Sequence, residues 1–276
     1  MHAFSIQEFV LVVVSAYIIF LVLYGFFLIF EIIFPAEKGQ RYIGKLRNLG
    51  ITAIYLVLGV FAIDALGVII PFDLHGAARL TLLPSIVVVL VYVFTFDCTY
   101  YWYHRALHTF PALWPIHEIH HADTELNVTT SYRTYWMELP LQSVIIGLPV
   151  SFAVGDIGTA YIITYITLIV WEFFTHANVR LHLYAFSPVI CGPQVHRIHH
   201  SILQEHRDKN FAQYFPFIDK LFGTYYAPSH NEFPPTGSRG LSVDASMGTV
   251  LKHPLSVWRR LFRSRKVAGN IDNIAP

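Results

Sequence analysis

The chain has 276 residues, of which 54% are hydrophobic, 16% aromatic and only 13% charged, whereas a soluble domain has about 25% charged residues. This composition excludes a disordered chain and a collagen-like fibre, and two cysteines are too few for a disulfide scaffold. The 19 basic and 18 acidic residues leave a formal charge of +1, so no basic field points to nucleic acid as a partner. The unusual count is that of the 15 histidines.

The apolar residues are gathered in segments that suit a membrane. Residues 9–30 carry no charge and are long enough, at about 1.5 Å per helical residue, to cross a hydrocarbon core of about 30 Å. Further candidate spans are residues 49–72, 80–96 with a helical continuation through Tyr103, 139–155 and 157–171. The last two are short, and the turn at 155–158 between them predicts a shallow helical hairpin. We therefore predict an all-α integral membrane bundle of about five transmembrane helices.

The charges of the loops predict the orientation of these spans. Residues 35–48 contain four basic side chains, Lys38, Arg41, Lys45 and Arg47, which the positive-inside rule places in the cytoplasm. With five spans, residues 104–138 and the chain after Phe174 then also lie in the cytoplasm, where they form a histidine-rich helical cap. We expect a multi-pass protein of the bacterial inner membrane or the endoplasmic reticulum.

Three regions follow from this organisation. Residues 1–48 form an extra N-terminal transmembrane helix with its basic loop, residues 49–228 the membrane domain with the histidines, and residues 229–276 a cytoplasmic tail. The basic and apolar residues at 258–266 are typical of a helix on an anionic membrane surface, and equally of a solvated basic end.

Three histidine clusters share helical spacing: His104 and His108; His117, His120 and His121; and His196, His199 and His200. Positions i, i+3 and i+4 of a helix face one way, so each cluster presents its imidazoles together. A lone histidine is more often an ordinary hydrogen-bonding residue, but eight in register predict a cage for two metal ions. Imidazole suits iron, copper, zinc or nickel, and an all-nitrogen site with an open position suits O2 at iron. The alternative is a histidine-rich membrane metal transporter or sensor, which would place its ligands near the middle of the bilayer.

The order and spacing of segments at 97–108, 117–121, 176–178, 196–200, 208–211 and 219–224 resemble the fatty acid hydroxylase and sterol desaturase superfamily. This resemblance implies a membrane enzyme that uses O2, two iron ions and two electrons to hydroxylate or desaturate a lipid, such as a sterol or a fatty-acyl chain. It also implies nine metal ligands: His104, His108, His117, His120, His121, His176, His196, His199 and His200. His182 stays open, because a helix would turn it about 240° away from His176.

The chain has no flavin or nicotinamide fingerprint, so we expect a separate electron donor, a ferredoxin or a cytochrome b5-like protein. Metal-bound histidines usually donate their second N–H to a carboxylate or carbonyl. Asp97, seven residues before His104, and Glu172, four before His176, are predicted to fill this role, with an interfacial residue as the alternative for Glu172. Similar roles are expected for Asn178, Asp208, Asn210 and Asp219.

The remaining polar and aromatic candidates receive less specific interpretations. Asn127 and Arg133 fit either this supporting role or a substrate entrance. Tyr100–Tyr103 and Trp114 are interpreted as headgroup-level anchors rather than as the lining of a substrate channel. The other five histidines do not share the helical spacing of the three clusters and are interpreted as surface or loop histidines: His2, His75, His206, His230 and His253.

Overall fold

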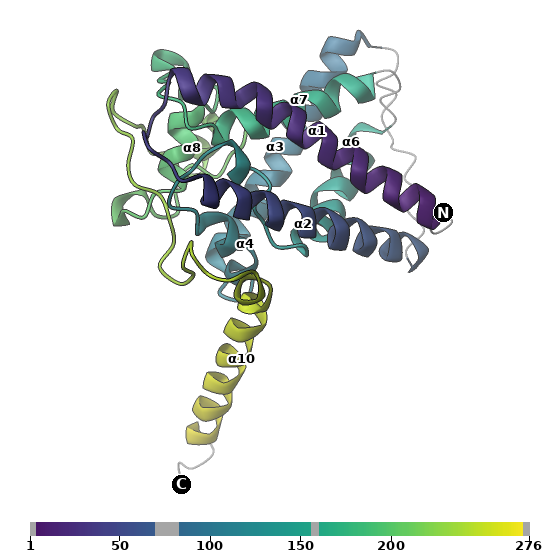
Figure 1. The fold of residues 1–276 in the computed structure, drawn as a ribbon, viewed down its shortest axis with the longest axis vertical. Helices are drawn as coiled ribbons and strands as arrows, with labels where there is room; N and C mark the ends of the chain where they lie inside the picture. Colours follow the sequence, from purple (N-terminus) through teal and green to yellow (C-terminus); the bar gives the residue numbers. More distant parts are fainter. Residues whose placement is uncertain (1–3, 70–82, 156–159, 273–276) are drawn as a thin grey trace.

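The computed structural model describes residues 4–69, 83–155 and 160–272, and all regular elements in these ranges are helical (Figure 1). The α-helices are α1 (Ile6–Ile33), α2 (Tyr42–Ile69), α3 (Ser85–Thr109), α4 (Trp114–His121), α5 (Glu138–Gln142), α6 (Leu148–Val154), α7 (Ala160–His176), α8 (Pro193–His199), α9 (Phe217–Leu221) and α10 (Met247–Asp272). A π-helical turn, Ser143–Gly147, joins α5 to α6. The two β-bridges described, Pro35 with Val179 and Ser201 with Thr236, are isolated. The prediction of an all-α fold is confirmed.

Within the described residues, three helices are long and apolar enough to cross a membrane: Ile6–Ile33, Tyr42–Gly67 and Ser85–Thr109. Two shorter apolar helices, Glu138–Val154 and Ile162–His176, correspond to the predicted shallow hairpin. The turn between them at 156–159, and the predicted span ends at 70–72 and 80–82, lie outside the described residues. The helices are thus consistent with a membrane bundle, and the number of spans stays a prediction.

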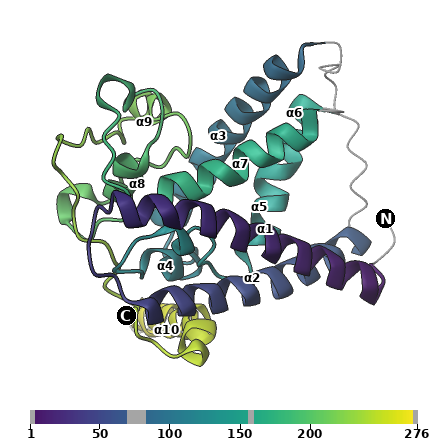
Figure 2. The ribbon, with the colours of Figure 1, turned by 45° about the horizontal axis from the view of Figure 1, so that its top comes forward.

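The long helices pack side by side, and the short helices α4, α8 and α9 lie at one end of them (Figure 2). Helix α1 contacts α2 and α7, and α3 contacts α6 and α7. Helices α4, α8 and α9, with the loops around them, form a cap at the end of the bundle where α1 finishes. Helix α10 packs on α4 and extends away from the body (Figure 1).

The basic loop between α1 and α2 belongs to this same end. Lys45 pairs with the buried Glu31 at 3.1 Å, and Arg41 pairs with Glu125 of the cap at 3.0 Å. The second oxygen of Glu31 accepts the backbone N–H groups of Val128 and Asn178, at 2.7 and 2.9 Å. A buried carboxylate therefore fastens the end of α1 to the cap, and the positive loop and the histidines share one end of the molecule.

Candidate metal centre

Four helices bring nine histidines together: α3 and α4 carry five of them, α7 carries His176, and α8 with its C-terminal residue carries three. They form two groups, one of His104, His108, His117, His121 and His199, the other of His120, His176, His196 and His200. Within each group the candidate ligand nitrogens lie within 4.8 Å of one another. The two H-x-x-H-H clusters are each divided between the groups, so every group depends on contacts between helices.

Like nitrogens face one another inside these groups. The Nε2 atoms of His104 and His117 are 3.0 Å apart, and the Nε2 atom of His176 is 3.0 Å from those of both His120 and His196. Six further ring nitrogens are buried without a hydrogen-bond partner: Nε2 of His108, His121 and His199, and Nδ1 of His120, His196 and His200. Buried polar atoms without partners are costly and rare, so their concentration here indicates a binding site.

The protonation state of the cap histidines suits a metal. Burial lowers the pKa of His199 to about 3 and lowers the pKa of His120, His121 and His200 well below the ordinary value. Neighbouring imidazoles lower these pKa values further, because like charges in one small volume repel. The side chains are therefore neutral at pH 7, and neutral imidazole is the form that binds metals.

The outward nitrogens of four of these histidines donate to carbonyl or carboxylate oxygens. The Nδ1 atoms of His104 and His199 donate to the backbone carbonyls of Phe211 and Lys209, at 2.8 and 2.9 Å. His176 Nδ1 lies 2.8 Å from the Glu172 carbonyl and 3.3 Å from its carboxylate, which is the contact predicted for Glu172.

The fourth outward nitrogen has a partner that the sequence analysis missed. His117 Nδ1 lies 3.2 Å from the carboxylate of Glu138, which is buried at the start of α5. Like Glu172, Glu138 is an acidic residue at the edge of an apolar segment. The same argument on the cost of a charge beside the membrane would therefore have found it.

The predicted contact between Asp97 and His104 is wrong. Asp97 instead accepts the backbone N–H groups of residues 213, 214 and 215, at 2.7, 3.1 and 2.7 Å. Seven helical residues share a face but span about 10.5 Å along the axis, which one side chain cannot bridge. Asp219 accepts the N–H groups of Phe211 and Ala212, so both carboxylates hold the loop whose Phe211 carbonyl meets His104.

The two asparagines are also misassigned, since neither contacts a histidine of the two groups. Asn178 exchanges hydrogen bonds with the backbone of Glu37, at 2.7 and 2.9 Å. Asn210 donates to the carbonyls of Val195 and Tyr226 from a left-handed conformation, φ 57°, which asparagine tolerates well. Their polarity stabilises loops, a use that spacing alone does not distinguish from support of a ligand.

Of two further candidates, Asp208 lies beside the clustered histidines and His182 does not. The Asp208 carboxylate lies 3.6 Å from His108 Nδ1, so this residue does border the histidines. His182 accepts the backbone N–H of Tyr184 at 2.9 Å and belongs to neither histidine group of the described residues.

Several secondary interpretations need correction because burial depends on tertiary packing. Tyr101 and Tyr103 are buried and Tyr100 lines a cavity, whereas Trp102 is 52% exposed, as an anchor would be. His206 and His253 are buried against Glu232 and Glu118, at 3.0 and 2.8 Å, and are not surface residues.

Three more residues singled out in the sequence make hydrogen bonds outside the two histidine groups. Asn127 caps the short 3-10 helix Val128–Thr130, the buried Arg133 donates to the Ile119 carbonyl, and His230 is bonded to Tyr184 at the surface. His2 and His75 lie outside the described residues.

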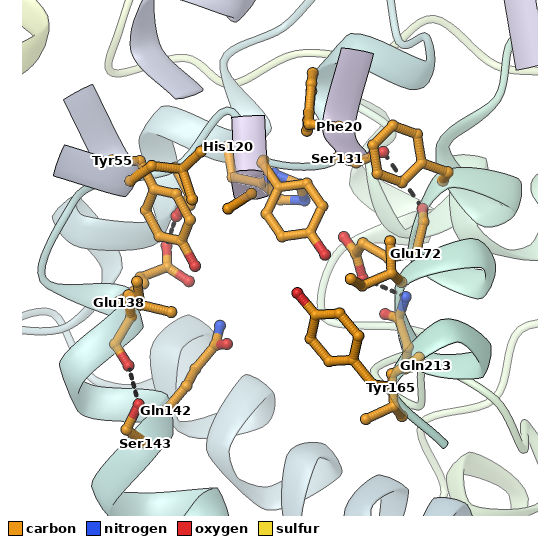
Figure 3. Close-up of a pocket in the computed structure, with 18 of the residues that line it drawn as sticks. Phe20, Tyr55, His120, Ser131, Glu138, Gln142, Ser143, Tyr165, Glu172 and Gln213 are labelled. Atoms are coloured by element: carbon orange, nitrogen blue, oxygen red, sulfur yellow. Dashed lines mark hydrogen bonds between the residues drawn. The ribbon is translucent and has the colours of Figure 1, made fainter. Parts of the chain in front are cut away.

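Two cavities reach the histidines. The first, of about 650 Å³, is bordered by His117 and His120 and extends between α1, α2, α3 and α7 among mainly apolar side chains (Figure 3). Glu138 and Glu172 point into it from opposite sides in Figure 3. The second, of about 540 Å³, is bordered by His108, His121 and His199 and has a more polar lining. The histidines therefore meet an apolar space through one set of rings and a polar space through another.

The fold and the site define an all-helical protein with apolar spans and a buried nine-histidine centre beside an apolar cavity. Residues 89–224 match the model of the fatty acid hydroxylase family. One relative is human alkylglycerol monooxygenase, which is 28% identical over 59% of this chain and 36% of its own length. Another is Arabidopsis thaliana methylsterol monooxygenase 1-3, which is 30% identical over 61% of this chain and 58% of its own length. An ornithine lipid hydroxylase of Rhizobium tropici is 26% identical over 51% of this chain and 42% of its own. No solved structure matches significantly.

The chain belongs to the fatty acid hydroxylase and sterol desaturase superfamily, as the resemblance of its histidine segments predicted. It spans only about a third of the length of the human relative. Helices α1 and α2 lie outside the residues that match the family.

Proposed function

We propose that this protein oxidises a C–H bond of a membrane lipid with O2, at a centre of two iron ions held by the nine histidines. The observation that carries the proposal is the position of this buried histidine cluster at the end of an apolar cavity among membrane-type helices. The names of the relatives, which include a monooxygenase and a hydroxylase of lipids, support the same reaction class. The product is an alcohol or an alkene.

The histidines fit such a centre. Two ligands at right angles on one metal, with metal–nitrogen bonds of roughly 2.1 Å, stand about 3.0 Å apart. The facing Nε2 pairs of His104 with His117 and of His176 with His120 have this separation, 3.0 Å. A metal would also satisfy the buried Nε2 atoms of His108, His121 and His199, which have no hydrogen-bond partner. Groups of five and four nitrogens suit two ions, each with a vacancy for O2.

The iron ions would supply the activation of O2, and the protein supplies the ligands and a dry channel. The carbonyl of Phe211 and the carboxylates of Glu138 and Glu172 orient the rings of His104, His117 and His176. Fixed rings hold the ligand nitrogens in place before any substrate binds.

The cavity has the form expected for a lipid chain. Near the histidines it is closed by Phe20 and Phe173, which are 4% and 0% exposed. Farther along the same two helices, Val12 and Tyr165 are 40% and 42% exposed. The cavity therefore opens at the apolar outer surface of the bundle, where a lipid chain can enter from the bilayer and reach His117 and His120.

We infer that the cap faces the cytoplasm, where a separate donor, a ferredoxin or a cytochrome b5-like protein, supplies the electrons. The basic loop at the cap end supports this orientation. The proposed regions are residues 1–48, 49–228 and 229–276, although α1 lines the same cavity as the helices of the second region.

Metal-dependent O2 consumption tests the function. The full chain, purified in detergent and loaded with iron, is mixed with a membrane lipid extract and a chemical reductant, and the products are identified by lipid mass spectrometry. We expect O2 uptake together with hydroxylated or unsaturated lipid, and loss of both in His120→Ala. Iron uptake into vesicles without lipid oxidation would instead support a transporter.

A further inference from the structure

The polar cavity reaches the histidines from a different side than the lipid cavity. The residues that line the two cavities do not overlap within the described part of the chain. The polar cavity touches three of the nine clustered histidines, His108, His121 and His199, which all belong to the five-histidine group. His108 is also the one histidine of the nine that is not fully buried. This cavity is thus a second approach to the centre, separate from the lipid cavity.

The mouth of this cavity is positively charged. Three arginines from separate segments line it, Arg207, Arg239 and Arg260, and all three are exposed. The acidic residues of the lining are fewer: Glu118 is buried and paired with His253 at 2.8 Å, and Asp208 lies 3.7 Å from Arg207.

Helix α10 adds further positive charge beside the mouth. It carries the exposed Arg259 and Arg263 next to Arg260. It is fastened to the cap by the contact of His253 with Glu118 and by the hydrogen bond from the Trp258 indole to the Ala112 carbonyl, at 2.7 Å. These contacts hold the helix with Arg260 in the lining of the cavity, and Arg259 and Arg263 are exposed cations close to it along the same helix.

Resting on the proposed function, we propose that the mouth of the polar cavity is the docking surface for a one-electron carrier protein with an acidic surface. Complementary charge guides such a carrier to the arginine rim. Trp114 lines the cavity, and the centroid of its ring lies 5.0 Å from the ring centroid of His108 and 5.5 Å from that of His121. Aromatic groups therefore connect the mouth to the five-histidine group. The lipid cavity cannot serve this purpose, because its open end lies among exposed apolar side chains of α1 and α7.

The electron balance shows what the docked carrier must deliver. Hydroxylation places one oxygen atom of O2 in the new alcohol and the other in water, and desaturation releases both oxygen atoms as water. Either reaction takes two electrons and two protons in addition to the hydrogen and electrons of the lipid. The carrier supplies the electrons one at a time and is itself oxidised, and the two protons come from the surrounding buffered solvent.

Two reductants separate docking from chemistry. The double variant Arg207→Glu, Arg239→Glu in the full iron-loaded protein is compared with the wild type, using either a reduced acidic plant-type ferredoxin or dithionite with methyl viologen. We expect the KM for ferredoxin to rise about tenfold or more, since reversed charges repel the carrier. Turnover with the chemical reductant should stay at the wild-type rate. The wild-type KM should also rise with salt, because the attraction is screened.

Lys38→Glu is the matched control, since Lys38 is an exposed cation on the basic loop at the same end of the molecule that does not line the cavity. It should leave the KM for ferredoxin unchanged. An unchanged KM in the arginine variant, or an equal loss with both reductants, would overturn the docking proposal. Binding of oxidised ferredoxin to the nanodisc-embedded protein gives the same comparison without turnover. If the wild type oxidises no lipid with either reductant, the proposed function fails instead, and this binding measurement still decides whether the surface attracts the carrier.

Discussion

Two carboxylates support one histidine each, and the geometry predicts that they differ in importance. His176 Nδ1 lies 2.8 Å from the backbone carbonyl of Glu172 but 3.3 Å from its carboxylate. Among the described residues, His117 Nδ1 meets only the Glu138 carboxylate, at 3.2 and 3.4 Å. A substitution of Glu172 therefore leaves the closer acceptor in place, whereas a substitution of Glu138 removes the charge from the single acceptor.

Loss of such an outer partner typically costs about 10–100-fold in metal affinity or activity. We expect Glu172→Gln at the low end, about tenfold, because the carbonyl still fixes the ring of His176. The amide can also still accept the hydrogen bond that Gln213 donates to this side chain at 2.6 Å. Glu138→Gln should fall at the high end, about 100-fold, since the ring of His117 loses its charged acceptor.

The assay is iron bound per protein by mass spectrometry, together with lipid turnover driven by a chemical reductant. Glu172→Gln should lose part of its iron and stay measurably active, and combining it with His176→Ala should add little to the loss of the single variant, since both act through one ligand. Far-ultraviolet circular dichroism of each variant controls for folding. Wild-type iron and turnover in Glu138→Gln, or a larger loss in Glu172→Gln than in Glu138→Gln, would refute the reasoning.

Three further predictions concern the ligands, the orientation and the lipid cavity. His199→Ala should abolish oxidation and lower bound iron without preventing membrane insertion, as measured by metal analysis and membrane fractionation, and full activity would contradict the metal assignment. A reporter fused after Phe174 should read cytoplasmic and one inserted at His75 external; the reverse pattern would separate the centre from cytosolic donors. Ile19→Trp, which narrows the open part of the lipid cavity, should raise the KM for the lipid about tenfold, equivalent to ~1.4 kcal/mol of binding. Val14→Trp, on the exposed face of the same helix, should leave the KM for the lipid unchanged. Equal KM values in the two variants would exclude entry of the lipid beside α1.

The sequence by itself determined the helical class and the positions of the histidines. Uncharged runs of membrane length predict helices because a chain in hydrocarbon must satisfy its own backbone. Spacing of three and four residues places imidazoles on one helix face, and this local rule holds in α4 and α8. A carboxylate one turn before a histidine, as in Glu172 and His176, follows from the same rule.

Only the tertiary structure decided which histidines share a group and what supports them. His120 joins His176, His196 and His200, while His117 and His121 of the same helix join His104. Asp97 shares a helix face with His104 but lies too far along the axis, and its effect passes through a loop more than a hundred residues away in the chain. Helical periodicity fixes directions within one element, whereas the distances between elements depend on how the helices pack, which no local spacing encodes.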